Sequence, residues 1–258
     1  MHLKGSAGNP LPTVWESLAN KGTQFLRGQL VLVCAAPGVG KSAFVLTYAL
    51  KSRVPTLYFS ADSDSYTQLS RSVSILTGWP MEKSIGLVRA EDLNGATAVL
   101  DSIPIRFDYT ASPDLDRLKI LMESYEEVYG DFPGLVVVDN VTNVRAGGAN
   151  DEDPFAGLEV TMEYLHDMAR NTGACVVGLH HVTGKYNDAD QPIPLSGIKG
   201  QIGRVPEMIL TLFRSSSQFG PDSLNVSTVK NRGPGQDPSG QDYVSLSYDG
   251  GTMHIKDR

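Results

Sequence analysis

The chain has 258 residues, of which 41% are hydrophobic and 20% are charged, and its formal net charge is −7. This balance is ordinary for a globular protein; it argues against bulk electrostatic binding of nucleic acid, and no apolar run approaches the length of a membrane span. The two cysteines, Cys34 and Cys175, each lie in an apolar β-like run, which favours buried free thiols in a reducing cytoplasm over a disulfide or a metal site.

The first thirteen residues contain Gly, Pro and Asn with little periodicity. This predicts a mobile N-terminus over 1–13, followed by a single domain over 14–258 that opens with a short helix at 14–19. The apolar run over 30–34 leads into a small-residue turn, Gly-Lys-Ser and a helical stretch to residue 50. This order predicts a strand, a phosphate-binding loop and a helix.

Glycines in such a loop let backbone N–H groups turn toward an anion, and the following helix presents its positive N-terminus to the same anion. Lys41 would reach the β- and γ-phosphates, and the Ser42 hydroxyl would complete a Mg²⁺ shell. Ala35 stands where the common pattern has its first glycine, so the match is to the looser form; a glycine-rich turn before an ordinary helix is the alternative. The residues expected to bind ATP are Pro37, Gly38, Val39, Gly40, Lys41, Ser42 and Ala43.

Strand-like and helix-like segments alternate along the rest of the chain. Helices are predicted through 68–73, over 115–128 and from Pro154 to 165, with a polar loop over 140–153. Strands are predicted at 54–60, 85–88, 103–109, 135–139, 174–179, 208–213, 224–229, 243–248 and 253–255. The pattern predicts an α/β fold with a mostly parallel central sheet flanked by helices and a C-terminal antiparallel β extension.

Polar residues follow several of the predicted parallel strands. Asp62, Asp139 and the pair His180-His181 each come just after such a strand, as the phosphate loop does. Because parallel strands deliver their carboxyl ends to one edge of a sheet, we expect these residues to meet there. Asp139 follows four consecutive aliphatic residues and is expected to hold Mg²⁺ together with Ser42; a capping aspartate after a strand is the alternative.

This order of motifs resembles the RecA-like P-loop ATPases, and most closely the DnaB-type hexameric helicases with their single-domain phage and plasmid relatives. The resemblance covers roughly residues 20–235, with the motifs in the expected order. It implies that the carboxylate after the strand at 54–60 activates the attacking water. Asp62 is the candidate base and Asp64 the alternative, while a role as a helix N-terminal acid would explain either residue.

The segment 176–181 is similar to the motif whose last polar residue senses the γ-phosphate in this family, which implies His181 as the sensor. A zinc site is the alternative. Adjacent histidines in an extended chain point to opposite sides, however, and no partner ligands stand at a useful spacing.

The segment 195–204 resembles the loop that these helicases project into their central channel, where backbone amides and a basic side chain hold the phosphates of single-stranded DNA. A flexible connector is the alternative. The resemblance implies that the DNA-binding residues are Lys199, Gly200, Gln201 and Arg204.

The segment 228–234 matches the Lys-x-Arg motif of the family and is also similar to RadA. The resemblance implies that Lys230 and Arg232 are catalytic residues that enter the nucleotide site of a neighbouring subunit and stabilise the transferred phosphoryl group. A solvated hairpin turn is the alternative.

The resemblance therefore implies an ATP- and Mg²⁺-dependent ATPase that forms a homo-oligomeric ring, expected to be a hexamer, and acts as a helicase or translocase on single-stranded DNA in replication or recombination. We expect no membrane partner and a cytoplasmic location, in the host if the chain is phage-encoded. Three alternatives stay open: a RadA-like or recombinase-like DNA-remodelling ATPase, a metal-dependent DNA nuclease using Asp62, Asp64 and Asp139, and a KaiC-like regulatory ATPase that binds no DNA.

Overall fold

The structure, a computed structural model, describes residues 8–146, 156–217, 220–233 and 235–258, with Ala156 and Gln201 described in the backbone only. Predictions for residues 1–7, for the end of the polar loop and for the start of the helix at Pro154 lie outside this part of the chain. Within it, no helix is both long and apolar enough to cross a membrane.

A single sheet of nine strands organises the described residues, in the order β3-β2-β4-β5-β1-β6-β7-β8-β9. The first six strands in this order run parallel to one another, and β7, β8 and β9 are antiparallel to their neighbours. The expected fold class is confirmed. The strands span Leu30–Cys34 (β1), Thr56–Ser60 (β2), Ile105–Asp108 (β3), Leu135–Asp139 (β4), Cys175–His180 (β5), Met208–Ser215 (β6), Asp222–Asn231 (β7), Tyr243–Asp249 (β8) and His254–Lys256 (β9).

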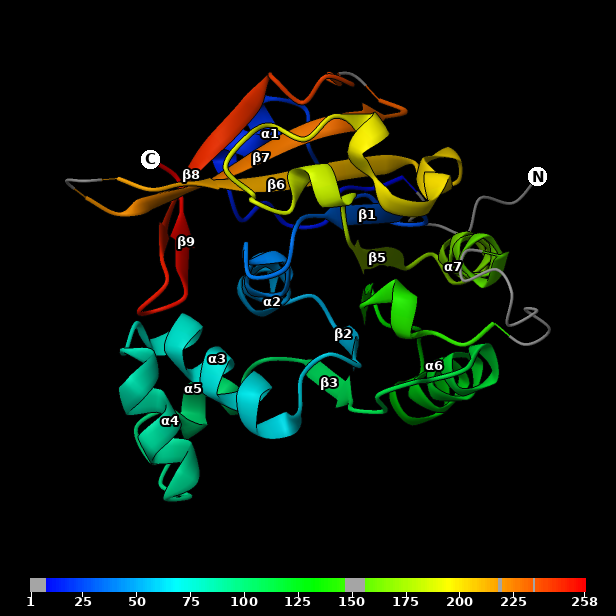
Figure 1. The fold of residues 1–258 in the computed structure, drawn as a ribbon. Helices are drawn as coiled ribbons and strands as arrows, with labels where there is room; N and C mark the ends of the chain where they lie inside the picture. Colours follow the sequence, from blue (N-terminus) through cyan, green and yellow to red (C-terminus); the bar gives the residue numbers. More distant parts are fainter. Residues whose placement is uncertain (1–7, 147–155, 218–219, 234) are drawn as a thin grey trace.

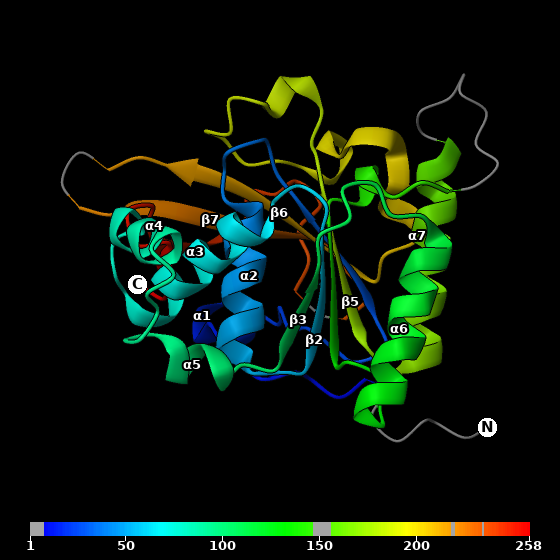
Figure 2. The same ribbon diagram turned by 90° about the horizontal axis from the view of Figure 1, so that it is seen from below.

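Helices cover both faces of the parallel strands (Figure 2), with α2 to α5 on one face and α6 and α7 on the other. This cover explains why every residue of β1, β2, β4 and β5 is buried and why these strands are runs of aliphatic residues without alternation. Both cysteines are free and buried in this core, as expected. The helices span Glu16–Asn20 (α1), Lys41–Ser52 (α2), Ser65–Thr77 (α3), Met81–Arg89 (α4), Thr97–Asp101 (α5), Leu115–Tyr129 (α6) and Ala156–Thr172 (α7).

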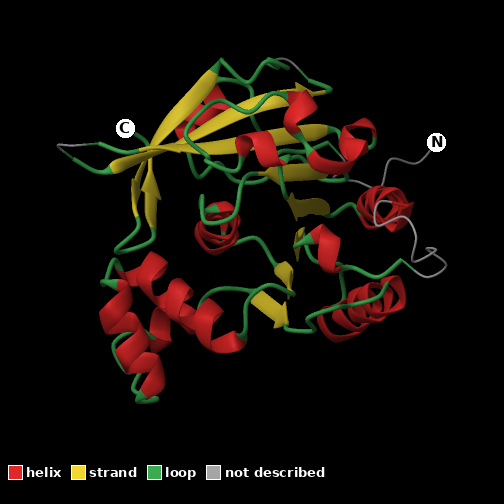
Figure 3. Cartoon of the chain, in the orientation of Figure 1, coloured by secondary structure: helices red, strands yellow, loops and turns green. Residues whose placement is uncertain are grey.

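Short 3₁₀ turns occupy the connections after β4 and β5 (Figure 3). They span Val141–Asn143 (η1), Gly184–Tyr186 (η2), Leu195–Gly197 (η3) and Lys199–Arg204 (η4). The segment 195–204, predicted as a loop, is therefore built from two such turns.

One predicted strand is wrong. The segment 85–88 lies within helix α4, which starts after Pro80 and packs against α3 (Figure 1). A run of four apolar residues does not distinguish a strand from a helix by periodicity. Ser84 donates its main-chain N–H to the Pro80 oxygen at 3.0 Å and is buried, so the helical register is set by the turn before the apolar run.

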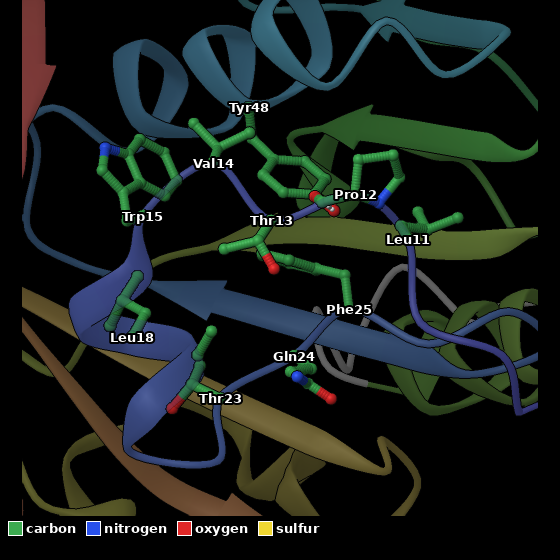
Figure 4. Close-up of a pocket in the computed structure, with 11 residues that line it drawn as sticks. Leu11, Pro12, Thr13, Val14, Trp15, Leu18, Thr23, Gln24, Phe25 and Tyr48 are labelled. Carbon is green, nitrogen blue, oxygen red and sulfur yellow. Dashed lines mark hydrogen bonds between the residues drawn. The ribbon is translucent and has the colours of Figure 1, made fainter.

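Residues 8–13, which were expected to belong to a mobile N-terminus, pair with the segment before β1. Leu11 donates its N–H to Phe25 at 2.8 Å and is buried. Trp15 follows and stacks on Phe44 of α2 with ring centroids 4.5 Å apart. Figure 4 shows Leu11, Trp15 and Phe25 gathered with Tyr48 around a small pocket beneath α2. The N-terminal segment is thus part of the core that supports α2, and Trp15 is a packing residue.

The strand register decides which residues share an edge of the sheet. Ser60 lies level with Asp139, and Cys34 lies level with both His180 and Thr211, so these strands end together. On the other side, Asn231 at the end of β7 pairs with Met208 at the start of β6, which lies level with Val31. The end of β7 therefore lies at the edge opposite to the phosphate loop.

Candidate nucleotide-binding site

The phosphate loop joins the end of β1 to the start of α2 (Figure 1). Gly38 and Gly40 have φ angles of +77° and +118°, a region that glycine adopts readily and other residues rarely. Gly40 is the N-cap residue of α2, where a side-chain oxygen usually accepts from the first turn; no side chain does so here. The N-terminus of α2 is thus available to a bound anion, as nucleotide binding requires.

Lys41 is only 7% exposed, and its Nζ donates to the main-chain oxygens of Ala35 and Ala36 at 3.2 and 3.4 Å. Burial lowers the pKa of Lys41, while Asp139, Cys34 and Asp62 act in the opposite direction. The ammonium group lies against the loop itself, in position to exchange weak carbonyl contacts for phosphate oxygens.

Asp139 ends β4 beside the loop and is 1% exposed. Its Oδ2 accepts a hydrogen bond from the Tyr58 hydroxyl at 3.0 Å, whereas Oδ1 is buried without a hydrogen-bond partner. Burial raises the pKa of Asp139, and hydrogen bonding by Ser42 and Tyr58 opposes this rise. An unpartnered carboxylate oxygen near a serine hydroxyl is the kind of donor set that Mg²⁺ takes from a protein when phosphates supply further oxygens. Ser42 and Asp139 therefore fit the ion.

Asp62, Asn140 and His181 lie next to one another at the same edge. The Nδ2 of Asn140 donates to Asp62 Oδ2 and lies 3.5 Å from His181 Nε2. Asp62 is exposed, and its main-chain N–H donates to the Asp139 oxygen at 3.2 Å. Burial lowers the pKa of His181, and the nearby charge of Lys41 lowers it further. A neutral sensor and an exposed carboxylate are thus joined through one amide.

Asp64 has another task. Its side chain accepts from the N–H of Thr67 at 2.8 Å and caps α3. This contact lowers the pKa of Asp64. A capping carboxylate is explained without catalysis, so the geometry favours Asp62 over Asp64 as the base.

The proposed DNA-binding segment is attached to the sensor strand. His180 is fully buried, and its Nε2 donates to the main-chain oxygen of Lys199 at 2.8 Å; the Lys199 N–H donates to His181 oxygen at 3.3 Å. Lys199 and Arg204 are exposed on η4, and Gly200 adopts a φ of +79°. The Gln201 side chain lies outside the described residues.

Lys230 and Arg232 lie at the opposite edge of the sheet, away from their own phosphate loop. Lys230 Nζ donates to the main-chain oxygens of Gly203 and Arg204 at 2.8 and 2.9 Å, and burial lowers its pKa. Arg232 Nη1 donates to Glu207 Oε1 at 3.2 Å, and the Arg232 side chain is 55% exposed. The structure therefore does not bring these two cations to the residues at the phosphate edge of the same chain.

Sequence reasoning missed four residues near these groups. Asn140 follows the predicted acid directly and could have been considered for that reason, and Tyr58 is a buried tyrosine that needs a partner for its hydroxyl. Arg214 lies over the ring of Tyr248, 4.6 Å from its centroid, and borders a groove beside Pro37 and Gly38. The role of Glu207 depends on strand register and carries no local sequence signal.

Comparison with known proteins decides the family. Residues 20–187 match the family model described as AAA domain. The chain belongs to the AAA domain family. The gene 65 protein of Mycobacterium phage L5 is 65% identical over 258 residues, which cover 100% of this chain and 96% of that protein.

Helicases are among the more distant relatives of this AAA domain chain. Replicative DNA helicase DnaB of Nostoc sp. is 24% identical over 167 residues, which cover 62% of this chain and 19% of that protein. The solved ATPase domain of G40P has a TM-score of 0.81 at 18% identity, covering 99% of this chain and 93% of that one. A solved DnaB-like replicative helicase gives the same TM-score and identity, with 63% of that chain covered. The expected RecA-like, DnaB-type ATPase fold is confirmed, and the chain is an ATPase of the helicase family.

Proposed function

We propose that this ATPase forms a ring, expected to be a hexamer, and moves along single-stranded DNA in replication or recombination. The observation that supports this most directly is the pair of hydrogen bonds between the sensor strand and η4, from His180 to the Lys199 oxygen and from the Lys199 N–H to His181. A residue expected to respond to the γ-phosphate is joined through the main chain to the segment expected to hold DNA. Such a connection is what a motor needs in order to link hydrolysis to DNA contact.

The residues at the phosphate edge have separate tasks in hydrolysis. Lys41 and the N–H groups at the start of α2 would bind the triphosphate, and Ser42 and Asp139 would hold Mg²⁺, which when bound neutralises charge on the phosphate oxygens. Asp62 would orient the attacking water and accept its proton, held in place by Asn140. Burial keeps the imidazole of His181 neutral near neutral pH, so it can exchange a hydrogen bond with the γ-phosphate without adding charge.

The finger residues support a site between subunits. Glu207, which contacts Arg232, is hydrogen-bonded to Leu30 at the start of β1, whereas the phosphate loop follows the end of that strand. Five residues of extended chain span about 16 Å, which an arginine side chain does not cross. Arg232 could therefore reach a phosphate only on another copy of the chain, and we propose that it does so, with Lys230 beside it.

The alternatives differ in how well the structure supports them. Asp64 caps α3, and among the described residues no group of three or more His, Cys, Asp or Glu side chains is placed to hold a metal ion, which speaks against the nuclease. A RadA-like remodelling ATPase would use the same nucleotide site, and a KaiC-like regulator would use it without DNA.

The test is a measurement of oligomer mass with and without ATP, followed by ATP hydrolysis with and without single-stranded DNA. A motor predicts a closed ring and hydrolysis stimulated by DNA, with strand displacement on a forked duplex. Stimulation without displacement would favour the remodelling ATPase, and the absence of stimulation would favour the regulator. DNA cleavage that survives Lys41→Ala would favour the nuclease.

A further inference from the structure

Glu207 lies just before β6 and joins three elements of the fold through one buried carboxylate. Oε2 accepts from the N–H of Leu30, the first residue of β1, at 2.9 Å. Oε1 is 2.8 Å from Nε2 of His166 on α7 and 3.2 Å from Nη1 of Arg232, which follows β7. The side chain of Glu207 is 9% exposed.

Such burial has a cost that these contacts offset. A carboxylate removed from water is unfavourable unless hydrogen bonds and opposite charge replace its hydration. Hydrophobic packing would serve better at this position if stability alone mattered, since replacing a buried ion pair by apolar groups is often neutral or stabilising. The charge of Glu207 therefore calls for an explanation beyond stability.

The contacts to Arg232 differ from the other two because they fix both ends of the residue. The Arg232 N–H donates to the Glu207 main-chain oxygen at 3.0 Å, while the guanidinium donates to the Glu207 carboxylate. One side of the guanidinium is thus held, and the side chain as a whole remains 55% exposed. An arginine otherwise loses about 2 kcal/mol of rotamer entropy when it is ordered, so a side chain that is already held loses less on engaging a phosphate.

We infer that Glu207 is a positioning residue for Arg232, which it holds in the conformation that enters the neighbouring subunit's nucleotide site. This inference rests on the proposed function, because it requires Arg232 to act between subunits. Glu207 itself does not touch the nucleotide. It acts from the subunit that donates the finger, not from the subunit whose phosphate loop binds the ATP.

The first test is steady-state ATP hydrolysis by Glu207→Gln, which keeps the size of the side chain and removes its charge. Loss of one charge-assisted hydrogen bond predicts a fall in kcat of about 10-fold with the KM for ATP unchanged. The matched control is Glu123→Gln on α6, where an exposed glutamate has only a 3.9 Å pair with Lys119; its kcat should equal the wild-type value. A normal kcat in Glu207→Gln would overturn the inference.

A double variant separates positioning from general structural support. If Glu207 acts through Arg232, adding Glu207→Gln to Arg232→Ala should cause no further fall in kcat. A second fall of the same size would show that the carboxylate supports the fold in another way and would overturn the inference. This comparison holds even if Glu207→Gln lowers the unfolding temperature, provided that hydrolysis is measured well below it.

Mixed rings decide which subunit Glu207 serves. Lys41→Ala subunits cannot hydrolyse ATP but carry an intact Glu207 and Arg232, so adding them should raise the turnover per Glu207→Gln subunit. No rise, in a mixture where Lys41→Ala does rescue Arg232→Ala, would overturn the inference alone. If Lys41→Ala rescues neither variant, the proposed intersubunit finger fails, and the double variant still shows whether Glu207 and Arg232 are coupled.

Discussion

The imidazole of His180 donates from Nε2 to the main-chain oxygen of Lys199 at 2.8 Å, although the two residues are 19 positions apart in the chain. His180 ends β5 at the edge where the phosphate loop begins, and Lys199 begins η4. The bond involves the main chain of Lys199, so it leaves the ammonium group of that residue to other partners. It fixes η4 to the nucleotide edge of the sheet without a covalent or rigid-loop connection.

This bond makes the stability of the protein sensitive to acid. Burial lowers the pKa of His180 to about 4, against an ordinary value of 6.5. Between these values the unfolded chain binds a proton that the folded chain does not, so the free energy of unfolding falls as pH falls from 6.5 to 4, by about 3 kcal/mol for the whole shift.

His180→Gln should remove this contribution, because glutamine can donate to the same oxygen and does not titrate. Urea unfolding of both proteins across this pH range measures it, and the wild type should lose more stability in acid than the variant. Two curves that stay parallel down to pH 4 would contradict the burial of a neutral His180.

Substitution of the two acids after β2 should separate catalysis from helix capping. Asp62→Asn should retain ATP affinity and lower turnover by roughly 10²–10⁴-fold, because it removes the proposed general base. Asp64→Asn should leave both turnover and stability close to wild type, since asparagine caps a helix about as well as aspartate. Nucleotide titration and steady-state hydrolysis measure the two effects. The opposite ranking would assign the base to Asp64.

Lys199→Ala should weaken binding of single-stranded DNA, because the exposed ammonium is proposed to contact a phosphate. The slope of log affinity against log salt should fall by about 0.7 for each phosphate of the single strand that the variant no longer neutralises. The His180 bond to the main chain at this position can persist in the variant. Lys119→Ala on α6, another exposed lysine, is the control for net charge. Equal affinity and slope in the two variants would remove Lys199 from the DNA site.

Much of the fold could be predicted because burial on two faces leaves an unambiguous signal. The strand at 135–139 is a short aliphatic run ending in an acid, and the rule that parallel strands end together places Asp62, Asp139 and His181 at one edge, as observed. The segment 85–88 failed because four apolar residues fit either period, and the packing of α4 on α3 decided between them.

The contacts of Glu207 could not be predicted for a different reason. They depend on the pairing of β6 with both β1 and β7, which brings residues 30, 207 and 232 together from three parts of the chain. A single acid before a strand has many explanations in a sequence. The same holds for Asn140, whose position between Asp62 and His181 follows from the alignment of three strand ends.

Arg232→Ala should leave ATP affinity close to wild type, because the residue lies at the edge of the sheet opposite to its own phosphate loop. Turnover should fall on the order of 10³-fold or more, as it does when an arginine finger is removed. Arg232→Lys should recover only part of this activity, since an ammonium keeps the charge but lacks the planar fork that bridges phosphate oxygens.

Mixing tests whether the finger acts between subunits. Arg232→Ala and Lys41→Ala should each be nearly inactive, and a mixture should regain partial activity, because some interfaces then pair an intact phosphate loop with an intact finger. Hydrolysis is measured across a series of ratios after subunit exchange has been verified by native mass spectrometry. Mixtures that exchange subunits and stay inactive at every ratio would show that Arg232 does not act on the neighbouring site.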